Sequence, residues 1–196
     1  MNKTGGQALR KMAILKITIN LIACFGLLFG LDQAARAEVT MTEYQVKALF
    51  LMNFTKYIDW PPVCFAGSNT PVIIGLYGEN RLGDALKLAV EGKTINGRRI
   101  VIQPIEKDDD LGKCHILFIG DSEKDHVSEI LDKVKALPVL TVGESDQFME
   151  QGGVIHFVKK KGKIRLEINL DAARQAKLEI SSKLLSVADV VKSKSN

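Results

Sequence analysis

The sequence has 196 residues, 27 Lys and Arg against 23 Asp and Glu, and a formal net charge of +4. Its apolar fraction of 46% and charged fraction of 26% are ordinary for a globular protein of one domain. These values exclude a mostly disordered chain, a collagen-like repeat and a protein with several membrane spans. The pI near 8.9 would suit a nucleic-acid or anionic-membrane partner only if the positive charge lies in the folded part of the chain.

The first 37 residues show the three parts of a secretory signal peptide. Basic side chains precede a mostly apolar run over 17–31, and Ala35-Arg36-Ala37 then supplies the small residues that a signal peptidase requires. The apolar run is shorter than the roughly 20 residues of a membrane-spanning helix, which argues against a permanent anchor. We therefore predict cleavage between Ala37 and Glu38, with a signal peptide over residues 1–37 and a periplasmic domain over residues 38–196.

A lipid anchor is the alternative to simple export. Leu21-Ile22-Ala23-Cys24 resembles a bacterial lipoprotein cleavage box, which would leave Cys24 lipidated and the protein tethered to a membrane. The sequence after Cys24 stays apolar through Phe29, whereas a lipoprotein cysteine normally opens a polar segment. We therefore expect no lipid anchor and no stable membrane insertion after cleavage.

Export also changes the charge balance and the cysteine count. Residues 1–37 hold five of the basic residues and one of the acidic residues, which leaves 22 of each sign in the mature domain. A neutral domain gives no electrostatic support for nucleic-acid binding. Cys64 and Cys114 remain after cleavage, in a compartment that permits disulfides. Their sequence positions leave open whether they form a disulfide or stay as reduced, buried thiols.

An opening helix is predicted at the start of the mature domain. Apolar residues at spacings of three and four favour a helix from Thr42 to Ile58, and Trp60-Pro61-Pro62 would end it. Strands and helices then alternate, with strands over 72–77, 99–105, 115–119 and 138–142 and helices over 80–91, 121–136 and 145–151. A hairpin with arms 154–158 and 163–170 follows, and helices over 171–176 and 181–191 close the chain. This order predicts an α/β fold: a single domain with a mostly parallel sheet flanked by helices and a C-terminal β-hairpin at the sheet edge.

No segment carries the residues that a nucleotide or phosphoryl-transfer site needs. The segment Gly78 to Gly83 has the outer glycine spacing of a phosphate loop, but Asp84 and Ala85 follow where Lys and Ser or Thr are required. A phosphoacceptor domain of this class would need two carboxylates after the first strand, and only Glu79 stands there. A strand-to-helix turn is the simpler interpretation of this segment.

Metal and nucleophile sites also lack their residue patterns. The three histidines, His115, His126 and His156, do not have the spacing of metal ligands. The nucleophile motif G-x-S-x-G is absent from the sequence. His115 directly follows Cys114, so in a strand their side chains would point to opposite faces and would not form a catalytic pair. We therefore expect no catalytic residue, no metal and no cofactor, which favours binding or regulation over catalysis.

Five blocks of the sequence, taken in order, resemble one known family. They are Glu43 to Tyr57 with Trp60-Pro61, Gly92 to Arg98, Cys114 to Ile119, Gly152 to Phe157, and Glu167 to Leu185. Together they are similar to the YfiR family, also called DUF4154, over essentially the whole mature chain. The resemblance implies a periplasmic, non-enzymatic regulator that forms homodimers. The best-known member represses an inner-membrane diguanylate cyclase by binding its periplasmic sensory domain, and release of this repression raises cyclic di-GMP and favours biofilm.

The same resemblance bears on the two thiols. Family members respond to redox conditions through disulfides, and Cys114 matches a family cysteine whose partner usually lies in the first strand, at the position of Gly75 here. Cys64 lies earlier in the chain, in a loop. A Cys64–Cys114 disulfide would therefore be a local variant rather than an inherited feature.

Four aromatic side chains in and after the opening helix are candidate anchors for a dimer or partner surface: Phe50, Phe54, Tyr57 and Trp60. The alternative is that Phe54 and Trp60 close the core beneath the proline-rich loop. The leading hypothesis for function is a regulator whose partner is a membrane-anchored diguanylate cyclase or a similar sensor. The alternative is a periplasmic small-ligand-binding module with no signalling partner, because α/β folds hold ligands at the ends of their strands.

Overall fold

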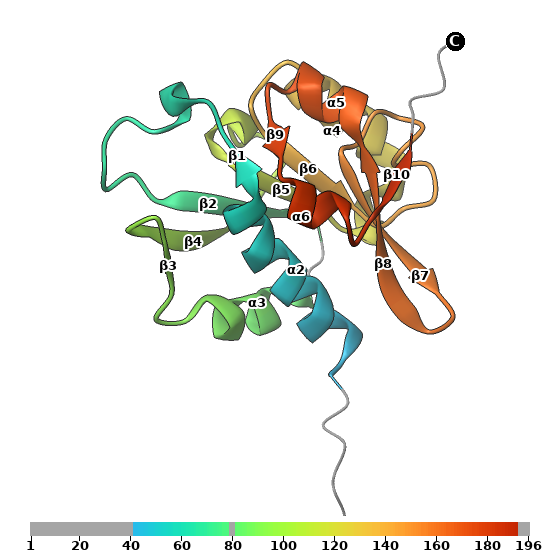
Figure 1. The fold of residues 1–196 in the computed structure, drawn as a ribbon. Coiled ribbons are helices and arrows are strands. Elements are labelled where there is room, and N and C mark those ends of the chain that lie inside the picture. Colours follow the sequence, from blue (N-terminus) through green and yellow to red (C-terminus); the bar gives the residue numbers. More distant parts are fainter. Residues whose placement is uncertain (1–40, 79–80, 192–196) are drawn as a thin grey trace, which may run out of the picture. The chain divides into compact units, whose positions relative to one another are not determined.

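The computed structural model describes residues 41–78 and 81–191, which are coloured in Figure 1. The predictions for the signal peptide, for cleavage between Ala37 and Glu38 and for Cys24 lie outside these residues. The opening helix, α2 (Glu43–Tyr57), begins at a capping box in which Thr42 and Gln45 each bond the other's backbone N–H. It ends at Tyr57, and the chain then leaves in extended form before the two prolines.

The remaining helices and strands follow in the order shown in Figure 1. The strands are β1 (Ile58–Asp59), β2 (Val72–Tyr77), β3 (Thr94–Ile95), β4 (Arg98–Ile105), β5 (Ile116–Ile119), β6 (Leu140–Gly143), β7 (Ile155–Lys160), β8 (Lys163–Asn169), β9 (Glu179–Ile180) and β10 (Asp189–Val191). The α-helices after α2 are α3 (Leu82–Val90), α4 (Val127–Val134), α5 (Leu170–Gln175) and α6 (Ser182–Leu185). Short 3₁₀ helices occupy Pro62–Cys64, Leu111–Lys113 and Asp121–His126.

Eight strands form one mixed sheet in the order β10-β8-β7-β6-β5-β2-β4-β3. The pairings from β4 through β2, β5 and β6 to β7 are all parallel, and β8 returns antiparallel to β7 through a turn at Lys161-Gly162. β10 lies outside β8, and β1 pairs separately with β9. The predicted α/β domain, with a mostly parallel sheet and a C-terminal hairpin towards one edge, is therefore confirmed.

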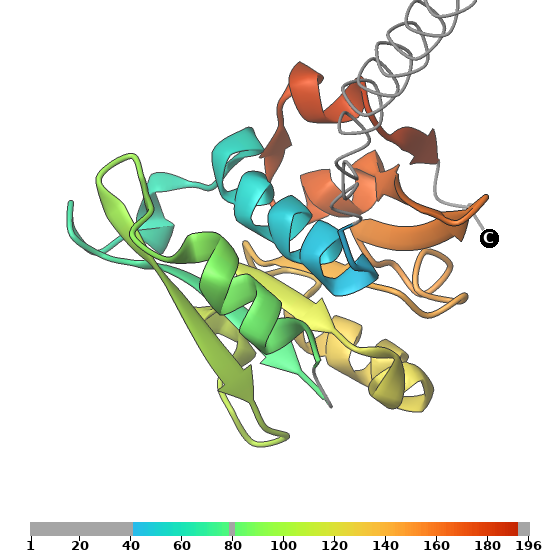
Figure 2. The same ribbon diagram turned by 90° about the horizontal axis from the view of Figure 1, so that it is seen from below.

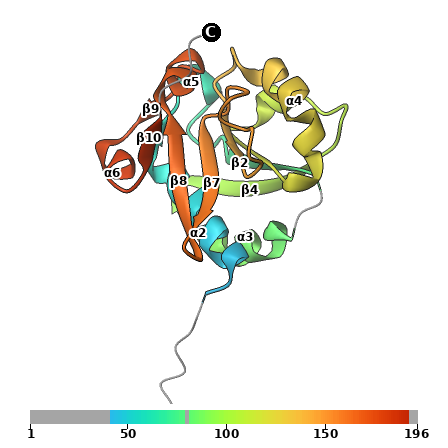
Figure 3. The ribbon, with the colours of Figure 1, turned by 90° about the vertical axis from the view of Figure 1, so that its right-hand side faces the viewer.

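Helices cover both faces of this sheet, so its central strands are apolar on both sides. Along β5, Ile116 and Phe118 point into the core beneath α2 and α3, whereas Leu117 and Ile119 point towards α4. Figure 2 shows α2 and α3 side by side on one face, and Figure 3 shows the sheet between this pair and α4. The side chain of Phe54, on α2, is fully buried in the first of these two cores.

Two predicted helices are wrong. Residues 145–151 form turns instead of a helix, because the Phe148 ring is buried between Gly143 and Gly153, where it would lie 2.2 Å and 2.1 Å from an added Cβ. The closing helix over 181–191 stops after α6, and β10 then pairs with the free side of β8. In this last segment, backbone hydrogen bonding to the open edge of the sheet outweighs the local helical preference of the sequence.

Candidate functional site

The carboxyl ends of the parallel strands form the edge of the sheet at which open α/β folds bind ligands. The chain order reverses at this edge, because β4 lies on one side of β2 and β5 lies on the other. A cleft of about 800 Å³ opens beyond β5, β6 and β7, and a smaller one of about 440 Å³ lies next to it. The larger volume is within the range of small-molecule sites. Both clefts share the residues Tyr44, Lys47, Asp121, Lys124 and Glu144.

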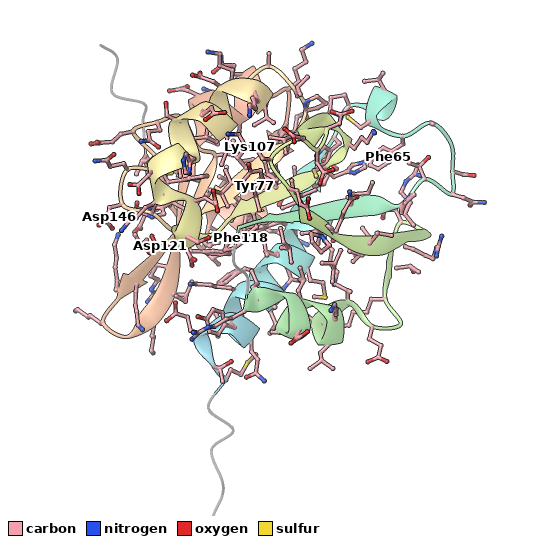
Figure 4. All side chains as sticks on the ribbon, turned by 180° about the vertical axis from the view of Figure 1, so that it is seen from behind. Phe65, Tyr77, Lys107, Phe118, Asp121 and Asp146 are labelled. Atoms are coloured by element: carbon pink, nitrogen blue, oxygen red, sulfur yellow. The ribbon has the colours of Figure 1, made fainter. Side chains whose placement is uncertain are left out.

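Four parts of the chain supply the walls of the larger cleft. The first turns of α2 contribute Glu43, Tyr44 and Lys47, and the loops after β5 and β6 contribute two sets of polar residues. The β7–β8 hairpin closes the far side with His156 to Lys159. In Figure 4, Asp121 and Asp146, which come from the two loops, lie at the same edge of the molecule.

Lys47 is the central cation of the cleft. It is only 5% exposed, and its ammonium contacts Glu43 at 2.7 Å and Glu144 at 2.5 Å. Glu144 also accepts a hydrogen bond from the backbone N–H of Asp121, and Glu43 also pairs with Lys159 at 2.8 Å. This charge network joins α2 to the β5 and β6 loops and to the hairpin.

The network keeps its members ionised. Burial works against the charge of Lys47, but the hydrogen bonds that its ammonium donates to Glu144 and Glu43 outweigh burial and leave the pKa of Lys47 raised. The hydrogen bonds from Lys159 and Lys47 hold the pKa of Glu43 below its usual range. A lysine that is both buried and firmly protonated is suited to holding neighbouring segments in place, not to acting as a base.

A second polar pair lies at the back of the cleft. His156 on β7 is directly opposite Glu167 on β8, and its Nδ1 lies 3.3 Å from the carboxylate. Glu167 also pairs with Lys160, which reaches Asp189 on β10. These cross-strand contacts tie β7, β8 and β10 together beside the cleft.

The predicted aromatic anchors divide between the core and the surface. Phe54 is fully buried and stacks against Phe157, so it belongs to the core of this chain. Phe50, Tyr57 and Trp60 are half-buried and therefore keep some surface for a partner. Phe50 packs against the rings of both Phe54 and Phe157.

Trp60 belongs to a stack of rings at the amino edge of the sheet. Its indole N–H donates to the carbonyl of His115 at 3.1 Å, and its ring meets the imidazole edge-on. His115 also stacks on Phe65, with the two ring centroids 4.7 Å apart, and Cζ of Arg98 lies 4.2 Å from the centroid of the Phe65 ring. Nδ1 of His115 accepts the backbone N–H of Ile73, and burial, partly offset by the Cys64 carbonyl, lowers the pKa of His115.

The two cysteines are free thiols in the structure, Cys64 half-buried and Cys114 buried. Burial and then the charges of Asp109 and Asp110 raise the pKa of the Cys114 thiol to about 11. Its Sγ lies 2.5 Å from where a Cβ on Gly75 would stand, so the family position named above is adjacent to it. A Cys64–Cys114 disulfide stays a prediction.

The residues at the centre of the cleft were not predicted from the sequence. Lys47 carried a usable signal, because a lysine flanked by apolar helix positions must find a partner when that face is buried. Glu144 and Asp121 directly follow buried strands, where parallel strands place their polar loop residues at one edge. Their pairing with Lys47 is long-range in sequence and needed the structure to be seen.

The described residues contain no group of three His, Cys, Asp or Glu side chains placed to hold a metal ion. Within the same ranges, 41–78 and 81–191, no helix is long and apolar enough to cross a membrane.

Comparison with known proteins gives a distant structure and a family. The crystal structure of a conserved domain protein from Vibrio cholerae O1 biovar El Tor, strain N16961, matches with a TM-score of 0.45 at 15% identity. The match covers 60% of this chain and 54%, about half, of that chain. No curated protein matches the sequence.

The family profile DUF4154, described as YfiR/HmsC-like, matches residues 44–189. This range takes in nearly all of the helices and strands from α2 to β10, with the ring stack and all residues of both clefts except Glu43. The family is regulatory rather than catalytic and is periplasmic, and it suggests a role in cyclic di-GMP signalling. The chain belongs to the YfiR/HmsC-like family.

Proposed function

We propose that the protein is a periplasmic repressor of an inner-membrane diguanylate cyclase and that it acts by binding the periplasmic sensory domain of this enzyme. The observation that carries the proposal is the family match over residues 44–189. Repression by binding needs an accessible surface and no reacting group. The mature protein, after cleavage between Ala37 and Glu38 and without a lipid on Cys24, would reach such a domain by diffusion.

The surface that we assign to the cyclase, or to a second copy in a homodimer, surrounds α2. Phe50, Tyr57 and Trp60 keep part of their rings exposed there, and large aromatic side chains dominate the binding energy of protein interfaces. The first turn of α2 adds Tyr44, whose side chain is exposed. Phe54 would support this surface from beneath.

The test combines a cellular and a biochemical measurement. Deleting the gene should raise cyclic di-GMP and surface attachment, and affinity capture of the exported protein from solubilised membranes should recover a cyclase. Tyr57→Ser should weaken both the repression and the capture of the cyclase, so cyclic di-GMP should rise in cells that carry it. Leu88→Ser, at an exposed apolar position on α3, should leave repression and capture unchanged. Unchanged cyclic di-GMP after deletion would refute the repression of a cyclase.

The cleft at the carboxyl edge favours a second candidate, a periplasmic small-ligand-binding module with no signalling partner. In that case a metabolite should raise the unfolding temperature of the purified protein while gene deletion leaves cyclic di-GMP unchanged. A thermal-shift screen that finds no stabilising metabolite would count against this candidate.

A further inference from the structure

Three carboxylates in the larger cleft are not used by the charge network. Asp121, Asp125 and Asp146 are exposed, and none makes an ion pair with a side chain in the described part of the chain. Glu43 and Glu144, in contrast, are matched by Lys47 and Lys159. Five carboxylates and three ammonium groups line the cleft in all, which is an excess of two negative charges when His156 is neutral.

An unsatisfied hydroxyl lies in the wall of the same cleft. Ser145 is only 8% exposed, and its Oγ is buried without a hydrogen-bond partner among the described residues. It stands between Glu144 and Asp146, and all three line the cleft. A serine hydroxyl can accept a hydrogen bond from an ammonium N–H, and an unpaired buried hydroxyl in a native protein calls for such an explanation.

An aromatic ring completes the wall on the α2 side. Tyr44 is 38% exposed, and the ammonium of Lys47 already lies 5.8 Å from its ring centroid. The negative face of such a ring attracts organic cations. The described residues hold no metal-ligating cluster, so a bare divalent ion is a poor match for these groups.

We propose that the cleft binds a small organic cation with at least two primary ammonium groups, an aliphatic polyamine. The charge excess of two selects a dication over a monocation, and the free carboxylates would take its ammonium groups. The Ser145 hydroxyl would accept one N–H at depth. The proposal concerns the ligand alone and does not depend on a cyclase partner.

The first test is calorimetric titration of the exported protein, purified in full, with putrescine and with spermidine. We expect one site, and about tenfold weaker binding of the monoamine butylamine, because it offers a single charge. Magnesium chloride at the concentration of the bound diamine should not displace it. Absence of binding, or equal binding of butylamine and putrescine, would overturn the proposal.

Matched variants locate the site. Replacing Asp121, Asp125 and Asp146 together by Asn should weaken putrescine binding about tenfold, and Ser145→Ala should weaken it about threefold. The control removes three exposed carboxylates elsewhere through the changes Glu91→Gln, Asp108→Asn and Glu179→Gln. Binding by the control should stay within about twofold of the parent. An equal loss in both triple variants would mean unspecific charge attraction and would contradict the proposal.

Failure of this proposal and failure of the repressor function give different results. The titrations use purified protein and no membrane, so a missing cyclase cannot affect them. A protein that binds putrescine but leaves cyclic di-GMP unchanged would keep the ligand site and lose the repressor role. A protein that represses the cyclase but binds no diamine would do the reverse.

Discussion

At the carboxyl edge of the sheet, a buried lysine holds several segments together through carboxylates, whereas at the amino edge the chain is held by stacked rings. Lys47, Glu43 and Glu144 form directional bonds around an open, water-accessible cleft. Trp60, His115 and Phe65 instead fill the space between β5 and the proline-rich loop. The first arrangement leaves room for a ligand, and its stability depends on charge. The stability of the second arrangement depends on how well the rings fill the space.

The largest effect is expected at the amino edge. Trp60→Ala should lower the free energy of unfolding by about 2–4 kcal/mol, because it removes ring contacts and the hydrogen bond to the His115 carbonyl. Urea unfolding in low and high salt should give the same loss. Trp60→Phe should recover part of it. A loss that shrinks in high salt would mean that charge, not packing, stabilises this edge.

The next largest effect is expected for the buried cation at the carboxyl edge. Lys47→Met should cost about 2–3 kcal/mol of unfolding free energy, since it leaves the largely buried Glu144 without its partner. Lys159→Met, which removes only the exposed pairing with Glu43, should cost under about 1 kcal/mol and less in high salt. Equal costs for the two variants would show that the network is not anchored by Lys47.

A third variant tests packing between the two edges. Gly75→Ala should destabilise the protein by about 1–3 kcal/mol, because the added Cβ would lie 2.5 Å from Cys114 Sγ and 2.9 Å from Ile105. Gly83→Ala in α3 meets nothing closer than 3.7 Å and should stabilise by about 0.5–1 kcal/mol. Adding Cys114→Ala to Gly75→Ala should recover stability if the thiol is the obstacle, and no recovery would exclude it.

Thiol chemistry separates the two cysteines. At pH 8 a group with a pKa of about 11 is ionised to the order of 0.1%, so iodoacetamide should modify Cys64 before Cys114 in the folded protein. Mass spectrometry of the labelled protein, with and without reductant, measures this order. Protection of both thiols until a reductant is added would instead establish the disulfide.

The smallest effects are pH-dependent, and they separate the two edges. The folded pKa of His115 is below its unfolded value of 6.5, so its contribution to stability is present above pH 6.5 and is lost as the pH falls from there. The folded pKa of Glu43 is below 4.5, so its contribution is lost only below pH 4.5. Lys47 has a raised pKa, so its contribution is present below pH 10.5 and is lost as the pH rises above it.

Urea unfolding between pH 7.5 and pH 4 measures how the free energy of unfolding changes with pH. The decrease below pH 6.5, called the upper slope, should disappear in His115→Gln, and the decrease below pH 4.5 should disappear in Glu43→Gln. An unchanged upper slope in His115→Gln would contradict the assignment to the ring stack.

Sequence periodicity predicted the elements whose signals are local. β2 has the predicted limits, Val72 and Tyr77, and the hairpin turns at Lys161-Gly162 as expected. The errors at 145–151 and after Leu185 arose where a contact distant in sequence decides the structure: a buried Phe148 ring and a free strand edge. The candidate site was missed for the same reason, because Lys47 and Glu144 are 97 residues apart.

The buried ring of Phe148 has a consequence for how this protein can diverge. The ring fixes the loop after β6 from behind, between Gly143 and Gly153, and it is not among the residues that line the larger cleft. Ser145 and Asp146 are therefore mounted on a support that makes no use of their own side chains, whereas the Glu144 side chain is itself part of the charge network. Substitutions at Ser145 and Asp146 would alter the proposed ligand preference while the wall keeps its place, so the site could change its ligand without rebuilding the fold.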